Sequence, residues 1–122
     1  MIIAGLAVAG ALGAVLRHLV DRLVQRRIRS GIPLGILAVN LTGSLVLGVL
    51  VASGLRHGIP TAWVTVAGTG LIGSYTTFST FAFDTVRLAE ADRRAVSLLN
   101  VVVSIAAGVG AAAAGLALGS LG

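Results

Sequence analysis

The sequence of 122 residues contains no cysteine and no lysine, and it has only four acidic residues, two histidines and two prolines. Without cysteine the chain has neither a disulfide framework nor a thiolate metal site. Charged residues make up 11% and hydrophobic residues 57%, whereas roughly 25% charge is usual in soluble domains. So little polar surface excludes an ordinary soluble globule, and the apolar content excludes a disordered chain. The composition predicts a small integral membrane protein with one domain over residues 1–122.

Charged side chains divide the sequence into four apolar stretches. Three of them, 30–55, 58–83 and 95–122, contain no charged residue, and each exceeds the roughly 20 residues that a membrane-spanning helix needs. The first, 1–16, reaches that length only if the helix continues past Arg17. A secretory signal is disfavoured there because the arginines follow the apolar run instead of preceding it. We therefore predict an all-α membrane protein with four transmembrane helices, near 2–24, 33–55, 61–88 and 94–120.

Glycine is abundant, with 17 copies, and small residues allow transmembrane helices to approach closely. Two sets recur every four positions: Gly5, Ala9 and Gly13, and Ala111, Gly115 and Gly119. These sets favour tight packing, either inside one subunit or between subunits. Four short helices enclose a polar path poorly, so we expect a dimer.

Polar side chains within the predicted spans form two stripes. Asn40 and Ser44 share one helical face of the second span. Ser97, Asn100 and Ser104 form a similar stripe on the fourth span. Interhelical hydrogen bonds, worth about 1 kcal/mol or less each, are a sufficient explanation of both stripes.

The third span carries the densest polar segment, GSYTTFSTF at 73–81, preceded by Gly68 and Gly70. Gly, Ser and Thr at this density weaken a helix, and non-helical backbone inside a membrane is tolerated only where it is buried in protein or lines a cavity. We therefore predict a break in this helix. Freed carbonyls there suit a small hard cation, and a half-helix N-terminus suits an anion.

Phe78 and Phe81 are three positions apart and so lie on one helical face. Two aromatic residues at this spacing are usually ordinary packing, but ring edges carry partial positive charge, and edges beside hydroxyl and amide donors suit an anion path. A cation path normally shows an acidic side chain. The four acidic residues, Asp21, Asp84, Glu90 and Asp92, all lie near the ends of the predicted spans.

The chain resembles the Fluc/CrcB family of fluoride channels over essentially its whole length. GALGAVLR at 10–17 looks like the G-x-x-G-A-x-x-R signature of the family's first helix, and PLG at 33–35 with VNLTGS at 39–44 looks like its second-helix motif. GLIG at 70–73 with TTFSTF at 76–81 resembles the third-helix core, which is the most specific of these motifs.

The resemblance implies passive export of fluoride across the plasma membrane, which lowers cytoplasmic fluoride, through an antiparallel dimer with two pores. It implies a structural Na⁺ at the dimer interface, held by the main-chain oxygens of Gly73 and Thr76 of each subunit. It also implies an anion pathway with these members: Phe78 and Phe81 as pore-lining aromatics, Asn40 as a hydrogen-bond donor, Ser79, Thr80 and Ser104 as hydroxyl donors, and Arg17 near the vestibule.

Two positions leave alternatives open. Arg17 either raises the local anion concentration at the vestibule or is an interfacial arginine that extends its head group to water. Asp84 stands where the family often has a glutamate, which leaves only the local pairing of that residue open.

The arginines are distributed unequally between the two predicted sides of the membrane. The first and third loops with their flanks hold eight of the nine, and the other side holds only Arg56. The positive-inside rule then predicts both termini outside and one fixed orientation, so the partner is either a second copy or an oppositely oriented homologous chain. Loops beside anionic lipid headgroups explain the net charge of +5, and this placement argues against nucleic-acid binding.

Three other functions compete with the channel. A small four-helix multidrug or cation transporter needs a carboxylate inside the membrane, and the spans lack a central one. A non-transporting assembly subunit explains the glycines but not the TTFSTF segment. An enzyme is least favoured, because His18 and His57 lie by the predicted loops and the chain has no lysine, so no such base is near the Ser and Thr cluster to activate a hydroxyl.

Overall fold

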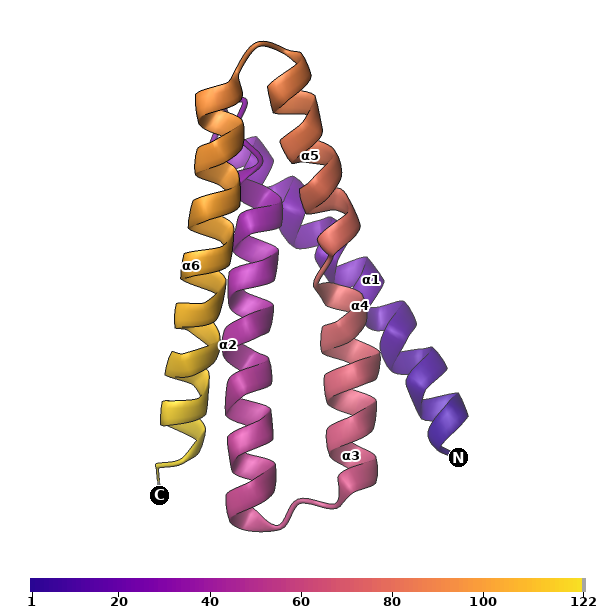
Figure 1. Cartoon of the computed structure of the whole chain (residues 1–122). Helices are drawn as coiled ribbons and strands as arrows, with labels where there is room; N and C mark the ends of the chain where they lie inside the picture. Colours follow the sequence, from indigo (N-terminus) through magenta and orange to yellow (C-terminus); the bar gives the residue numbers. More distant parts are fainter. Residues whose placement is uncertain (122) are drawn as a thin grey trace.

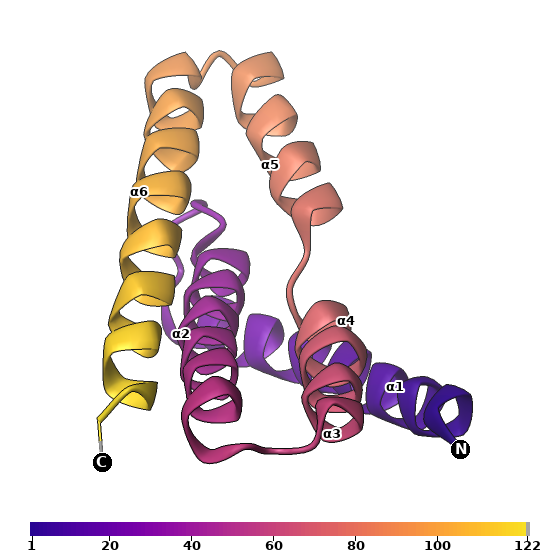
Figure 2. The same ribbon diagram turned by 60° about the horizontal axis from the view of Figure 1, so that its bottom comes forward.

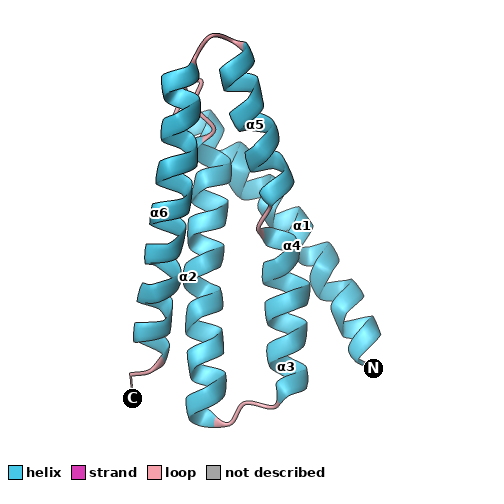
Figure 3. Cartoon of the chain, viewed as in Figure 1, coloured by secondary structure: helices cyan, strands magenta, loops and turns pink. Residues whose placement is uncertain are grey.

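The computed structural model describes residues 1–121, and every regular element in that part of the chain is helical (Figure 3). Three long helices are α1 (Ile2–Arg27), α2 (Leu34–His57) and α6 (Arg94–Gly119). Between α2 and α6 the chain forms four shorter segments: α3 (Thr61–Thr65), the π-helix η1 (Val66–Ile72), α4 (Gly73–Tyr75) and α5 (Phe78–Glu90). The helices predicted near 2–24, 33–55 and 94–120 are confirmed, and the shorter segments occupy the range predicted as 61–88.

Within the described residues, α1, α2 and α6 are long and apolar enough to cross a bilayer. Their large hydrophobic side chains mostly face outward, as at Leu12, Val46 and Leu99. Few apolar side chains are buried inside the chain, and Val39 on α2 is the largest that is completely enclosed. An apolar exterior around hydrogen-bonded helices is the arrangement that lipid requires.

The long helices pack in two groups. In Figure 1, α2 and α6 run side by side, while α1 crosses behind and packs against η1 and α4. Figure 2, seen from the lower end, shows the same crossing of α1 past α3 and α4. Both termini and the α2–α3 turn lie at one end of the molecule, and the α1–α2 and α5–α6 loops lie at the other. The chain therefore places the arginine-rich loops together, as the sequence predicts.

Glycines make the close contacts inside each group. A Cβ at Gly13 on α1 would overlap the Leu71 carbonyl of η1, and a Cβ at Gly115 on α6 would overlap the Leu45 carbonyl of α2. A Cβ at Gly5 on α1 would lie 3.1 Å from Val66 Cγ2, which is also a tight contact. The sequence left open whether the repeated small residues pack inside one subunit or between subunits. For Gly5, Gly13 and Gly115, packing inside one subunit is confirmed.

The helix ends follow local backbone chemistry. Pro33 and Pro60 directly precede α2 and α3 instead of occupying their first turns, where their fixed φ and missing N–H are equally harmless. Gly58 ends α2 in the left-handed conformation, with φ 66°, which glycine adopts without a steric penalty.

Candidate functional site

Two residues, Thr76 and Thr77, separate α4 from α5. Thr76 has φ −78° and ψ 155°, and Thr77 has φ −147° and ψ 126°, so the backbone here is extended; we call it the 76–77 link. The helical run that ends at Tyr75 presents its carbonyl end to the link, and α5 presents its N–H end. The two helix dipoles therefore place partial charges of opposite sign on either side of the link.

Thr77 begins α5 as its N-cap. Its hydroxyl accepts a hydrogen bond from the Thr80 N–H at 3.2 Å, which satisfies one of the amides that a helix start leaves without a partner. Threonine is a preferred residue in this role because its side-chain oxygen reaches the third amide of the helix. The extended backbone at 77 is thus the normal start of α5.

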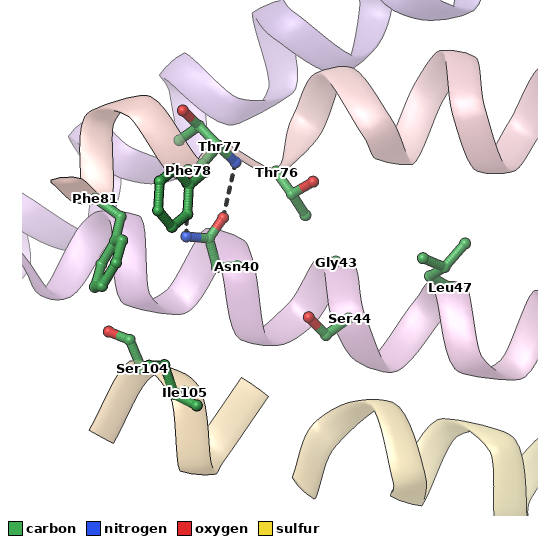
Figure 4. Close-up of a pocket in the computed structure, with 10 residues that line it drawn as sticks. All are labelled: Asn40, Gly43, Ser44, Leu47, Thr76, Thr77, Phe78, Phe81, Ser104 and Ile105. Atoms are coloured by element: carbon green, nitrogen blue, oxygen red, sulfur yellow. Dashed lines mark hydrogen bonds between the residues drawn. The ribbon is translucent and has the colours of Figure 1, made fainter. Parts of the chain in front are cut away.

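The side chain of Asn40 on α2 forms hydrogen bonds with the backbone of the 76–77 link. Its Oδ1 accepts from the Thr77 N–H at 2.9 Å, and its Nδ2 donates to the Thr77 carbonyl at 3.0 Å (Figure 4). A side-chain amide thereby supplies both partners that the extended backbone needs. The amide of Asn40 donates to the backbone of Thr77. An amide NH₂ has two hydrogens, so one is left for another acceptor.

A cavity of about 330 Å³ lies beside the link, between α2, α5 and α6. It brings together four of the residues predicted for the anion pathway, Asn40, Phe78, Phe81 and Ser104, with Thr76 (Figure 4). The remaining lining residues are Gly43, Ser44, Leu47, Thr77 and Ile105. We call it the central cavity. Its wall combines aromatic rings, a carboxamide and hydroxyls, and none of the lining residues is acidic.

Other predicted residues lie outside this lining. The hydroxyls of Ser79 and Thr80 surround the Thr77 hydroxyl, at 3.2 Å and 3.3 Å. Gly73 begins α4 with its residue surface exposed. Arg17 lies on α1, half-buried, and is not among the residues that line the central cavity.

Sequence reasoning omitted Gly43, Ser44 and Thr77 from the pathway. Ser44 shares a helical face with Asn40, which is a signal that the sequence does carry. Gly43 is the point where α2 meets the link, because a Cβ there would overlap Thr76 Cγ2. That close approach is a tertiary contact, and no sequence spacing indicates it.

The polar stripe on α6 divides between two roles. The Ser97 hydroxyl donates to the Thr85 carbonyl at 2.7 Å, and the Asn100 amide donates to the Thr85 hydroxyl at 2.9 Å. These are the interhelical hydrogen bonds expected from the stripe, and they join α6 to α5. Ser104, the third member, instead faces the central cavity.

A second cavity, of about 350 Å³, lies at the arginine-rich end. Its polar lining consists of Gln25, Asp84, Arg87 and Arg93, so one carboxylate lies beside two arginines. Arg93 also donates to the Gly31 carbonyl at 3.4 Å, which connects the two loops. A narrow gap bordered by Asp84 and Phe81 separates it from the central cavity. The second cavity, the gap and the central cavity thus form a row that leads from the basic end to the link.

The outward-facing apolar side chains and the three helices long enough to cross a bilayer define a multi-pass membrane protein. The chain belongs to the CrcB family: the family model described as CrcB-like protein, Camphor Resistance (CrcB), matches residues 4–116.

Curated relatives match the chain over nearly its full length. A protein of Leifsonia xyli subsp. xyli named Fluoride-specific ion channel FluC 1 is 44% identical over 99% of this chain and 88% of its own. Proteins of the same name from Nocardia farcinica and Frankia casuarinae are 47% and 48% identical, over 95% and 93% of this chain and 79% and 92% of their own.

Proposed function

We propose that this chain is a fluoride channel subunit, which conducts fluoride passively across the plasma membrane and so lowers cytoplasmic fluoride. The observation that carries the proposal is the central cavity, where the rings of Phe78 and Phe81 lie beside the Asn40 amide and the Ser104 hydroxyl. Positive ring edges and neutral donors together replace part of an anion's hydration shell. The choice of fluoride is supported by the names of the relatives.

The proposed channel has four spans. The third consists of α3, η1, α4 and α5 in series, and the 76–77 link is its break near mid-membrane. Extended backbone at that depth requires protein partners for its polar groups, and the two hydrogen bonds between Asn40 and Thr77, one donated by each residue, supply them for Thr77. The break then serves to place Phe78 and the start of α5 on the anion pathway.

A structural Na⁺ fits the other side of the link. In a continuous helix the Gly73 carbonyl would accept from the Thr77 N–H, but that donor bonds Asn40 instead. The carbonyl end of a helix also carries partial negative charge. The main-chain oxygens of Gly73 and Thr76 would hold the ion, which supplies a fixed positive charge between two subunits.

The remaining pathway residues follow the row of cavities. Arg17 and the arginine-rich second cavity would concentrate anions at the basic end. Ser79 and Thr80 would offer their hydroxyls to an anion near the start of α5, next to the Phe78 ring. Lipid headgroups would surround the basic loops on their outer surface.

The channel is proposed to be an antiparallel dimer, since one chain leaves Phe78 78% exposed and so leaves one side of the pathway without a wall. The partner is a second copy of this chain or an oppositely oriented homologous chain. The strong arginine asymmetry favours the homologous chain, because a single sequence inserted in both orientations has nearly balanced loops.

The alternative, a small multidrug or cation transporter, gains no support. Proton-coupled cation transport needs a carboxylate at the substrate site, and none of the residues lining the central cavity is acidic. The relatives likewise carry the name of an anion channel.

Efflux from liposomes tests the proposal. The full-length chain is reconstituted alone, and fluoride and chloride release are recorded with ion-selective electrodes. Fluoride release far above chloride release supports the proposal for a homodimer. Fluoride release only after a homologous chain is added supports the heterodimer. Equal release of both anions, or selective release of a cation, would contradict it.

A further inference from the structure

The two carbonyl oxygens assigned to Na⁺ share one feature, which is that the helical donor of each is bonded elsewhere. In an α-helix the carbonyl of residue i accepts from the N–H of residue i+4. The Gly73 carbonyl would therefore accept from Thr77, and the Thr76 carbonyl from Thr80. The regular series is intact just before this point, because Thr76 N–H donates to the Ile72 carbonyl at 2.9 Å.

Each of the two donors is bound by a side chain. Asn40 Oδ1 accepts the Thr77 N–H at 2.9 Å, and Thr77 Oγ1 accepts the Thr80 N–H at 3.2 Å. Thr77 is buried, with 7% of its surface exposed, so water cannot readily replace these acceptors. Because residues 76 and 77 are extended, neither carbonyl lies in a helical pair with its i+4 amide. Both bonds stabilise this link against a continuous helix, in which those amides would compete with a cation for the same oxygens.

We propose that Asn40 and Thr77 are positioning residues for the cation site, which keep the Gly73 and Thr76 carbonyls free by binding their helical donors. Asn40 then serves two ions at once: its Oδ1 protects the cation site, and the second hydrogen of its Nδ2 faces the anion pathway. The inference rests on the proposed Na⁺ site and deepens it, since it names side chains that act on the site without touching the ion.

The two side-chain acceptors, Asn40 Oδ1 and Thr77 Oγ1, differ in this respect from a neighbouring hydroxyl. The Ser44 hydroxyl lines the same cavity, but the hydrogen bonds of the Thr77 and Thr80 amides do not involve it. Ser44→Ala is therefore a matched control, which removes a polar atom from the central cavity and leaves both diverted amides in place.

The test measures thermal unfolding of the purified full-length protein in detergent, titrated with Na⁺ against a background of N-methylglucamine. Wild type is expected to unfold at a higher temperature as Na⁺ is added. Asn40→Ala and Thr77→Ala are each expected to raise the Na⁺ concentration at half-effect by about fivefold or more, because each lets one helical hydrogen bond re-form on a ligand oxygen. Thr77→Ser keeps the hydroxyl and is expected to retain the wild-type midpoint, as is Ser44→Ala.

The outcomes separate this inference from the proposed function. If wild type shows no Na⁺-dependent shift, the Na⁺ site itself is wrong, while fluoride efflux still judges the channel. If wild type shifts and Thr77→Ala responds at the same Na⁺ concentration as Thr77→Ser, the positioning role is overturned. Should Asn40→Ala fail to fold, Asn40→Asp replaces it: its carboxylate still accepts the Thr77 N–H, so Na⁺ is expected to stabilise it while fluoride efflux is lost.

Discussion

The rings of Phe78 and Phe81 lie 5.6 Å apart with their planes tilted by 54°. This is the tilted geometry that aromatic pairs prefer, in which the edge of one ring approaches the other. Both rings line the central cavity, yet Phe78 is 78% exposed. Its ring therefore contributes little to folding of the single chain, which makes it suitable for a functional test.

Phe78→Ile is expected to lower fluoride efflux by roughly tenfold or more while leaving assembly intact, because an aliphatic side chain has no positive ring edge. Efflux from liposomes and size-exclusion chromatography measure the two properties. Phe83→Ile is the matched control: Phe83 lies on the same helix and is 62% exposed, but it does not line the central cavity. Unchanged efflux in Phe78→Ile removes the ring from the mechanism.

Gly43→Ala is expected to reduce fluoride efflux, because the added methyl overlaps Thr76 Cγ2 and pushes the 76–77 link away from α2. Thr76→Ser deletes that methyl, so the double variant Gly43→Ala/Thr76→Ser should recover part of the loss. Recovery is only partial because Tyr75 Cδ1 also lies 3.2 Å from the new atom. A double variant no better than Gly43→Ala would show that the contact with Thr76 is not the cause.

Gly115→Ala is expected to destabilise the protein by about 1–3 kcal/mol, the usual cost of overpacking, because its Cβ would overlap the Leu45 carbonyl on α2. Gly110→Ala on the same helix meets nothing within 4 Å and should be neutral or slightly stabilising, as alanine is the better helix former. Thermal unfolding in detergent compares the two, and equal stability would contradict the packing described for α2 and α6.

The charge asymmetry predicts a single orientation in the membrane. The absence of cysteine allows single-site labelling with Ser30→Cys in the α1–α2 loop and Ser120→Cys after α6, both at exposed positions. In intact cells a membrane-impermeant maleimide should label position 120 only, and position 30 should react after permeabilisation. Half-labelling of both positions in intact cells would instead indicate insertion in both orientations.

The long helices were predictable because their lengths follow from uncharged runs. α2 and α6 begin and end within two residues of the prediction, and α1 continues three residues beyond it, to Arg27. Arginine side chains at that end can reach the interface, so charge does not stop the helix there. The π-helix at Val66–Ile72 was not predicted. Within it, a Cβ at Gly70 would lie 2.9 Å from Ala9 Cβ on α1, a tertiary contact that sequence spacing does not indicate.

The types of residue at the candidate site were predictable from the sequence, whereas the hydrogen bonds between them were less so. The TTFSTF segment and Asn40 indicated which side chains gather at the cavity, because polar groups in an apolar span need protein partners. The pairing of Asn40 with the Thr77 backbone could not be predicted. It depends on the position of α2 along its axis relative to the 76–77 link, which no sequence periodicity specifies.

The packing of α6 against α2 has a consequence for biosynthesis. Ser104 and Ile105 on α6 form one wall of the central cavity, and α6 follows the other helices in the chain. A nascent polypeptide released before this helix enters the bilayer has the phenylalanines and Asn40 but lacks the opposing wall. In the proposed channel, the wall that this chain contributes to the ion path is therefore completed only when its last helix has entered the bilayer.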